Sequence, residues 1–368
     1  MSDHRLRGSL RRALHQVEAR VGRRSAPAAV DEPVVAEPAA PVEPAVAVEP
    51  AVVVEPTLAE RLPADLIADV RPDLSGKQYI RAHELPESGP YPWLDQPDWA
   101  DELDRRSAAG ELDDTTRELC VRFATDGYAV VPGVLSSDEC DQVWDAYLRG
   151  VADGVVAPSP EKMGDDDPHP GHVMNAHIEL PEVRAAASNP QLMALVDTLL
   201  GVDPILFQTL LFPKGRGQLE HSDTIHMTTY PHGYMCAAWI ALEDIDPDAG
   251  PLCYYPGSHR LPRIYGSDVD LSPERFADEL YGAVAERYEP AVQQLLVRSG
   301  IEKQVFLPRK GDVLIWHDNL IHGGTPRTDV RPSRKSLVCH YFGRGALCYH
   351  DLSGKIADRV YDPEPVTT

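Results

Sequence analysis

Short apolar segments separated by Gly, Pro and Asp most limit how this chain can fold. Each segment is too short for a core helix, and β-branched and aromatic residues are frequent in them, which is typical of strands. The predicted strands are 128–131, 207–211, 234–242, 252–255, 313–317 and 337–342. They do not alternate regularly with helices, as a parallel sheet would require. We therefore predict a mainly β fold with flanking helices, a β-sandwich or jelly roll.

Helices are indicated at two places by their end signals. Ser136 and Glu139 form a capping box, which predicts a helix from there to Leu148. A second helix is predicted from Ser272 and Pro273 to Arg298. It ends before Gly300 and is expected to break at Pro290. Residues 61–115 are acidic, with isolated aromatics and weak periodicity, so we expect an irregular wrap around the core.

The first 24 residues are basic, whereas the 368-residue chain as a whole has a net charge of -23. They hold seven arginines against Asp3 and Glu18, a net charge of +5. Five aliphatic residues recur at helical spacing, namely Leu6, Leu10, Leu14, Val17 and Val21. We predict a basic amphipathic helix over 1–24, and three interpretations stay open: a peripheral anchor on an anionic membrane surface, a docking helix for an acidic protein, or a tail without fixed contacts.

Residues 25–60 consist largely of Ala, Pro, Val and Glu, with Glu-Pro recurring every six residues from Glu37 to Pro56. Proline at this density prevents helices and central strands. We therefore predict a disordered, semi-extended tether, followed by one folded domain over 61–368.

Composition excludes several classes of function. The net charge of -23 argues against nucleic acid as a partner, because phosphate binding needs an excess of clustered Lys and Arg. Six scattered cysteines without a C-x-x-C pair indicate reduced thiols. No apolar run is long enough to span a bilayer. We expect a cytoplasmic protein, with the inner surface of a membrane as an alternative location through 1–24.

The residue types that bind metals occur in two distant segments. In His221-Ser222-Asp223, residues two apart on an extended strand face the same side, so an imidazole and a carboxylate can reach one ion. His322 follows the apolar strand 313–317, and two strand ends can meet across the mouth of a barrel. A surface or capping pair is the alternative for His221 and Asp223. With His322 added, we predict a catalytic metal site formed by these three residues.

Two imidazoles and one carboxylate are the ligand set of non-haem Fe(II) oxygenases and leave three coordination positions open. A bidentate 2-oxo acid and O2 would fill them. Arg334, twelve residues after His322, can bind the other carboxylate of such an acid through two parallel hydrogen bonds. Ser336 faces the same side and can add a third. A solvated residue in a basic segment is the alternative for Arg334.

Ordered motifs extend through the C-terminal two thirds of the chain. They lie at 123–133, 207–209, 221–226, 239–244, 250–252, 256–259, 311–317, 322–324 and 334–341. Together they resemble the phytanoyl-CoA dioxygenase-like family of Fe(II)/2-oxoglutarate-dependent oxygenases, over about residues 118–362. The resemblance implies a double-stranded β-helix (jelly roll, cupin-like) core, Fe(II) on His221, Asp223 and His322, and 2-oxoglutarate on Arg334, with O2 as co-substrate.

The same resemblance suggests further residues around the site. It makes Gln208 and Trp239 walls of the 2-oxoglutarate pocket. It also places a strand near His177 along the substrate cavity, so His177 is a candidate substrate contact. His226 differs in parity from His221 and would face away on a regular strand, so an indirect or packing role is favoured over ligation, with substrate contact also considered. His259 and His340 are interpreted as structural.

The resemblance implies a 2-oxoglutarate-dependent dioxygenase. We expect it to hydroxylate an unactivated C–H bond of a small or a glycan- or lipid-linked molecule and to release succinate and CO2. Asp223 favours hydroxylation or a related oxidation, because similar enzymes that halogenate carry a small residue in place of the carboxylate. Nothing in the sequence resembles a basic site for CoA phosphates. Desaturation or epimerisation with the same cofactors and a non-enzymatic tethered scaffold remain as alternatives.

Overall fold

The computed structural model describes residues 57–67, 71–86, 89–160, 168–271, 273 and 281–357. These residues belong to one compact unit. The predicted basic helix over 1–24, and the tether up to residue 56, lie outside the described residues. Within the described part of the chain, no helix combines the length and the apolar character needed to cross a membrane.

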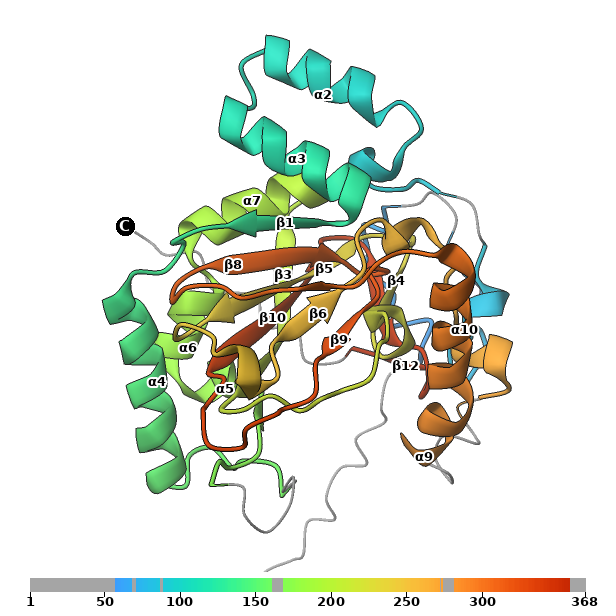
Figure 1. The fold of residues 1–368 in the computed structure, drawn as a ribbon. Coiled ribbons are helices and arrows are strands. Elements are labelled where there is room, and N and C mark those ends of the chain that lie inside the picture. The colour runs from blue at the N-terminus through green and yellow to red at the C-terminus, as the bar shows by residue number, and fades with distance from the viewer. Residues whose placement is uncertain are drawn as a thin grey trace, which may run out of the picture. The chain divides into compact units, whose positions relative to one another are not determined.

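Antiparallel strands form the centre of the molecule (Figure 1). A six-stranded sheet has the order β1-β8-β5-β10-β3-β2, and two three-stranded sheets have the orders β7-β6-β9 and β12-β11-β4. The strands are β1 (Tyr128–Val131), β2 (Val173–Met174), β3 (Pro204–Phe212), β4 (Thr228–Tyr230), β5 (Met235–Ala241), β6 (Leu252–Tyr254), β7 (Gln304–Val305), β8 (Val313–His317), β9 (His322–Gly324), β10 (Ser336–Gly343), β11 (Leu347–His350) and β12 (Lys355–Ile356).

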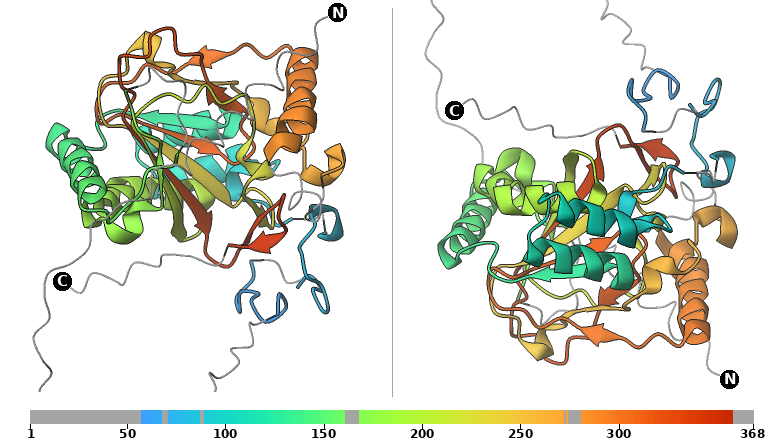
Figure 2. Two further views of the ribbon diagram at one scale, coloured as in Figure 1. Left: turned by 90° about the horizontal axis from the view of Figure 1, so that it is seen from below. Right: turned by 90° about the horizontal axis from the view of Figure 1, so that it is seen from above.

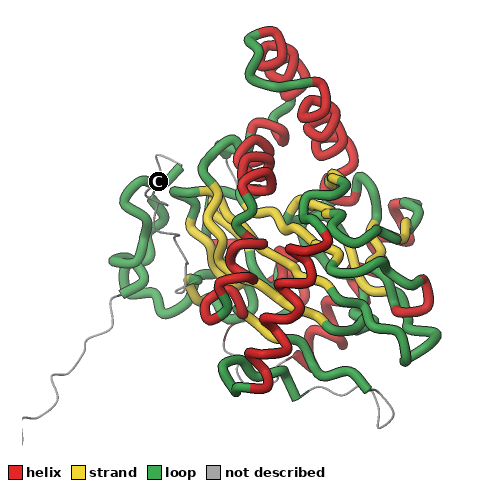
Figure 3. Tube along the Cα trace, turned by 90° about the vertical axis from the view of Figure 1, so that its left-hand side faces the viewer, coloured by secondary structure: helices red, strands yellow, loops and turns green. Residues whose placement is uncertain are grey.

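Most helices cover one side of the strands, and two helices near residue 290 lie at the end of the molecule away from α4 (Ser137–Ala152) (Figures 2 and 3). The α-helices are α2 (Trp99–Ala108), α3 (Asp114–Asp126), α4 (Ser137–Ala152), α5 (Ala176–Glu179), α6 (Pro181–Ala187), α7 (Pro190–Leu200), α9 (Tyr281–Ala283) and α10 (Glu289–Ser299). A π-helical segment, Val284–Tyr288, joins α9 to α10. The α10 helix lies at the end of the molecule away from α4 in both views of Figure 2.

The six-stranded sheet buries both faces, and β5 shows how. Its residues Cys236, Ala238 and Ile240 pack with the helices α3, α4, α6 and α7 in one hydrophobic cluster. The alternate residues Ala237 and Trp239 belong to a second cluster on the other face, together with residues of β6. Side chains along a strand point to opposite faces, so a strand buried on both sides is apolar throughout. This is why the sequence shows uninterrupted apolar runs.

The arrangement is the predicted mainly β jelly roll with flanking helices. Strands β1 and β8 have the predicted bounds, and the other four predicted strands differ by one to three residues at their ends. The capping box at Ser136 is present and opens α4, which continues four residues beyond the predicted end, to Ala152. The described part of the second predicted helix runs to Ser299, followed by Gly300 at a φ of 67°. The predicted break at Pro290 is absent, because Pro290 lies in the first turn of α10 and the backbone stays helical from Tyr281 to Ser299.

The prediction of an irregular wrap over 61–115 is wrong for its last part. Trp99–Ala108 is a regular helix, and α3 begins at Asp114. The apolar signal of α2 is weak because Leu103 is its single buried residue. Its polar face is stabilised locally, since Glu102 forms ion pairs with Arg105 and Arg106 at helical spacing.

Candidate metal and 2-oxo acid site

The side chains of His221, Asp223 and His322 converge within the jelly roll. One potential ligand atom from each residue lies within 4.8 Å of the others, and all three residues are buried. The Nε2 atoms of His221 and His322 are 4.0 and 3.6 Å from Oδ1 of Asp223. Two nitrogens and one carboxylate oxygen thus face a common point, which is the donor set expected for a divalent transition metal with open positions.

Backbone geometry explains how these residues meet. His322 begins β9, and His221 pairs with it through an isolated antiparallel bridge. Ser222 has extended backbone angles, with φ -103° and ψ 150°, so His221 and Asp223 point to the same side. The short 3₁₀ turn Asp223–Ile225 then ends the extended segment.

Hydrogen bonds fix the tautomer of both imidazoles. Nδ1 of His221 lies 2.9 Å from the carbonyl of Leu219, and Nδ1 of His322 lies 3.0 Å from that of Leu320. A carbonyl can only accept, so Nδ1–H donates in both residues and the Nε2 lone pair is left for a metal. At present Nε2 of His221 accepts from the side-chain amide of Gln218 at 3.2 Å, a contact that a metal ion would replace.

The protonation states suit cation binding. Burial, with a contribution from His322, lowers the pKa of His221 to about 4, so the ring is neutral. Burial alone would raise the pKa of Asp223, but the neighbouring His322, His340 and His221 outweigh it and hold that pKa well below its ordinary value. A neutral imidazole and an ionised carboxylate are the forms that bind metals.

The second carboxylate oxygen of Asp223 is held from the other side. The indole Nε1–H of Trp316 donates to Oδ2 over 2.8 Å, and Nε2 of His340 lies 3.7 Å from the same atom. Trp316 is on β8 and His340 on β10, the strands that flank β5 in the six-stranded sheet. The indole hydrogen bond leaves Oδ1 directed toward the two histidines. The sequence predicted neither contact, and it assigned His340 a structural role.

A cavity of about 730 Å³ opens directly in front of these residues. Its walls include predicted residues Gln208, Trp239 and Arg334, as well as His340 and His350, which the sequence analysis did not select. The volume lies in the range of small-molecule sites.

Arg334 is a buried cation that faces this cavity. The residue is 5% exposed, and its Nη1 donates to the carbonyl of Gly250 at 3.1 Å. Its Nε is buried without a hydrogen-bond partner, and no carboxylate in the described ranges forms an ion pair with it. Burial, together with Arg216 and Arg327, lowers the pKa of Arg334 to about 10. An unpaired buried guanidinium is costly, so the site is suited to a carboxylate ligand.

Of the other residues predicted for the 2-oxo acid pocket, two line the cavity and one does not. The ring of Trp239 lies 5.7 Å from the guanidinium carbon of Arg334, and Gln208 lines the cavity from β3. Ser336 is fully buried and does not line the cavity, and its hydroxyl has no hydrogen-bond partner among the described residues.

The orientation expected for His226 is wrong, but its position agrees with the substrate contact that was also considered for it, and His177 lies away from the cavity. His226 lines the cavity, with its ring 5.7 Å from that of His221, because the 3₁₀ turn after Asp223 breaks the alternation of a strand. His177 is buried in α5, with Nδ1 2.9 Å from the hydroxyl of Thr209, and is not among the described residues that line the cavity. The expected strand near His177 does reach the cavity, but through Met174.

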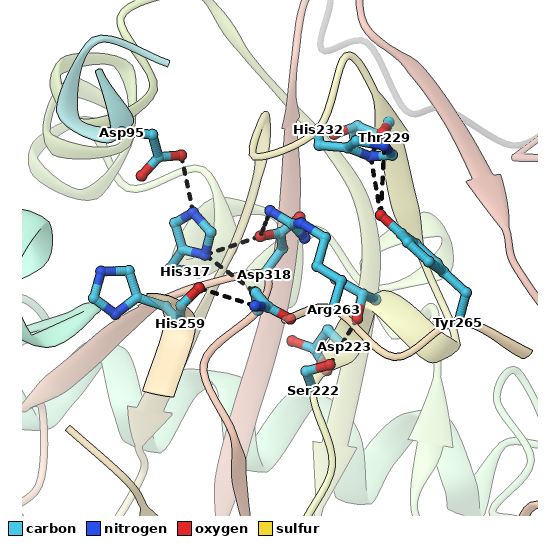
Figure 4. A network of polar contacts seen from close by, with 12 residues as sticks. Asp95, Ser222, Asp223, Thr229, His232, His259, Arg263, Tyr265, His317 and Asp318 are labelled. Carbon is cyan, nitrogen blue, oxygen red and sulfur yellow. Dashed lines mark hydrogen bonds and ion pairs between the residues drawn. The ribbon is translucent and has the colours of Figure 1, made fainter. Parts of the chain in front are cut away.

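A network of buried and half-buried charged residues lies near Ser222 and Asp223 (Figure 4). His317 lies between Asp95, at 3.0 Å, and Asp318, at 2.9 Å. Arg263 donates two hydrogen bonds to Asp318. Burial alone would lower the pKa of His317, but the two carboxylates outweigh it and raise that pKa to about 9. The protonated ring joins residues 93–95 to the end of β8, the strand that carries Trp316.

Comparison with known protein sequences gives three findings. The sequence model of the family described as phytanoyl-CoA dioxygenase (PhyH) matches residues 123–336. The ectoine dioxygenase of Stutzerimonas stutzeri (strain A1501) is 26% identical over 262 residues, which cover 67% of this chain and 84% of that relative. Phytanoyl-CoA dioxygenase domain-containing protein 1 of Rattus norvegicus is 33% identical over 162 residues, which cover 41% of this chain and 49% of that relative.

A solved structure supports the fold. The non-heme alpha ketoglutarate dependent carbocyclase SnoK from nogalamycin biosynthesis superimposes with a TM-score of 0.50 and 21% sequence identity. The match covers 65% of this chain and 87% of that chain.

Proposed function

Because the chain belongs to the phytanoyl-CoA dioxygenase (PhyH) family of Fe(II)- and 2-oxoglutarate-dependent dioxygenases, we propose that it hydroxylates an unactivated C–H bond of a small molecule. In this proposal His221, Asp223 and His322 bind Fe(II), and Arg334 binds the distal carboxylate of 2-oxoglutarate. The observation that carries it is the convergence of these three ligands beside a cavity that contains a buried, unpaired guanidinium.

Iron, 2-oxoglutarate and O2 together supply the oxidising power, and one oxygen atom enters the substrate as 2-oxoglutarate is converted to succinate and CO2. The chain's own residues would bind and orient the metal and the oxo acid and shield them from water. Trp316 holds Oδ2 of Asp223, which keeps the carboxylate directed toward the histidines. Trp239 and Phe212 pack beside Arg334 and exclude water from the ion pair that it would form with the oxo acid.

The cavity favours an uncharged polar substrate. Among its described lining residues, fixed charges are limited to Asp223, Arg334 and Arg216, and Arg216 lies close enough to Arg334 to lower its pKa. The remaining polar groups are amides and imidazoles, including those of His226 and His350. We propose a small neutral molecule, or the neutral part of a glycan- or lipid-linked one. The described lining residues do not include the several cations that a CoA moiety would need.

Product analysis tests the reaction. Purified protein with Fe(II), 2-oxoglutarate and O2 is expected to release succinate, and candidate substrates that accelerate the release should gain one oxygen atom. A product that loses two hydrogens would indicate desaturation, and a product of unchanged mass would indicate epimerisation. Asp223→Ala should abolish succinate release. Release by this variant at the wild-type rate would contradict the proposal.

A further inference from the structure

The segment that contains His221 and Asp223 has little support from the sheets. His221 forms one isolated bridge to His322, and residues 213–220 before it belong to no strand. Metal ligands must be held to within a fraction of an ångström to favour one geometry. Other contacts must therefore fix this segment.

Alternation along the extended segment shows where those contacts are. Since His221 and Asp223 face the cavity, Glu220 and Ser222 face the opposite side. Both of them contact the helical segment that precedes His322 in the sequence. The first contact is made by Tyr288, the last residue of the π-helical segment.

The hydroxyl of Tyr288 contacts the backbone N–H and carbonyl of Ser222, as a neighbouring strand would in a sheet. It accepts a hydrogen bond from the backbone N–H of Ser222 at 3.0 Å and lies 3.4 Å from the carbonyl of the same residue. Tyr288 is 1% exposed, and burial raises its pKa to about 12, so the hydroxyl stays protonated and can donate as well as accept. π-Helical turns are rare and occur frequently at functional sites.

A second set of contacts holds Glu220. Its carboxylate accepts from the amide of Gln293 on α10 at 2.7 Å and from the hydroxyl of Tyr255 at 3.0 Å. Lys303, just beyond α10, forms an ion pair with it at 2.6 Å. The residues on both sides of His221 are thus tied to the 281–303 segment.

None of the described residues in 281–303 lines the cavity, so their contacts with Glu220 and Ser222 connect this segment to the proposed metal site indirectly. We propose that Tyr288 is a positioning residue of the metal site, and that the contacts of Tyr288 and Gln293 clamp the segment that carries His221 and Asp223. The inference rests on the proposed function, because it takes these two residues as metal ligands.

The test measures the binding of Co(II) to the metal-free, full-length protein and the visible d–d spectrum of bound Co(II), which reports ligand geometry. Tyr288→Phe removes one hydroxyl and should weaken Co(II) binding about tenfold or more, with an altered spectrum. Tyr341→Phe is the matched control, since its buried hydroxyl donates to the carbonyl of Ala187 on the helix-facing side of the sheet. This control should bind Co(II) as wild type does.

A second pair of variants covers the case in which Tyr288→Phe does not fold. Gln293→Leu removes the amide donor to Glu220 from an exposed position on α10, and Gln294→Leu changes the adjacent exposed residue. Weaker binding by Gln293→Leu alone supports the clamp. Wild-type affinity and spectrum in both Tyr288→Phe and Gln293→Leu would overturn it while leaving the proposed function intact. Absence of Co(II) binding by wild type would overturn both.

Discussion

His221 and His322 lie directly opposite each other and exchange both backbone hydrogen bonds, each 2.9 Å long. The two residues are 101 positions apart in the sequence, yet this bridge places their side chains on the same face, with ring centroids 4.5 Å apart. The backbone contact therefore determines the separation of the two proposed nitrogen ligands. It can be disturbed without changing either histidine.

Gly323→Ala should weaken metal binding although all three proposed ligands remain. A Cβ at position 323 would lie 2.9 Å from the carbonyl oxygen of Gln218 and 3.2 Å from the backbone N of Glu220, so the backbone before His221 must shift. Isothermal titration with Fe(II) under argon should show at least a tenfold loss of affinity. Gly282→Ala is the control, because its added Cβ meets no described atom within 4 Å beyond its chain neighbours and its own helix backbone. Equal affinities of the two variants would contradict the assignment of the bridge.

Arg334→Lys should weaken 2-oxoglutarate binding by about tenfold or more while leaving Fe(II) binding unchanged. Lysine keeps the positive charge but cannot form two parallel hydrogen bonds to a carboxylate. Equilibrium binding of 2-oxoglutarate to the Fe(II)-loaded protein measures the effect. Arg331→Lys, an exposed residue paired with Asp329, is the control and should match wild type. Wild-type affinity in Arg334→Lys would place the oxo acid elsewhere.

Trp316→Phe should weaken Fe(II) binding by about tenfold to a hundredfold. The substitution removes the indole N–H that lies 2.8 Å from Oδ2 of Asp223, so the carboxylate can rotate away from the histidines. Trp144→Phe, on α4, tests for a general effect of losing an indole and should bind Fe(II) normally. Thermal unfolding of both metal-free variants separates loss of stability from loss of affinity.

Stability should decrease as the pH rises from about 6.5 to 9. The pKa of His317 is raised to about 9 in the folded protein, above its ordinary value near 6.5, so protonation stabilises the fold fully below pH 6.5 and this stabilisation is lost as the pH approaches 9. The shift corresponds to about 3 kcal/mol in the free energy of unfolding.

Asp95→Asn tests this assignment, because it keeps the shape of the side chain that contacts His317 and removes its charge. Urea unfolding at pH 6, 7.5 and 9 should show a smaller decrease in stability for Asp95→Asn than for wild type. Parallel decreases in the two proteins would assign the pH dependence to other groups.

The core strands could be predicted because burial on both faces makes them nearly continuous apolar runs, as in residues 313–316 of β8. The described strands that were not predicted, namely β2, β4, β7, β9, β11 and β12, are two to four residues long. Such short segments carry too few residues to show a strand pattern in the sequence. Similarly, helix α2 contains many charged residues and is stabilised by ion pairs and a single buried leucine, so its apolar periodicity is weak.

The proposed ligands and Arg334 could be selected from residue type and spacing, whereas their supporting contacts could not. The hydrogen bond of Trp316 to Asp223 spans 93 residues, and that of Tyr288 to Ser222 spans 66, so no local pattern indicates either. The orientation of His226 was mispredicted because the sequence does not show that the chain turns after Asp223.

The central claim is that His221, Asp223, His322 and Arg334 together form a site for Fe(II) and 2-oxoglutarate. Anaerobic titration of the metal-free protein with both ligands tests it most directly, by following the weak visible charge-transfer band of the chelate. The account predicts this band in wild type, its loss in Asp223→Ala, and its appearance in Arg334→Ala at much higher 2-oxoglutarate concentrations or not at all. A wild-type protein that shows no band and binds neither ligand would contradict the account.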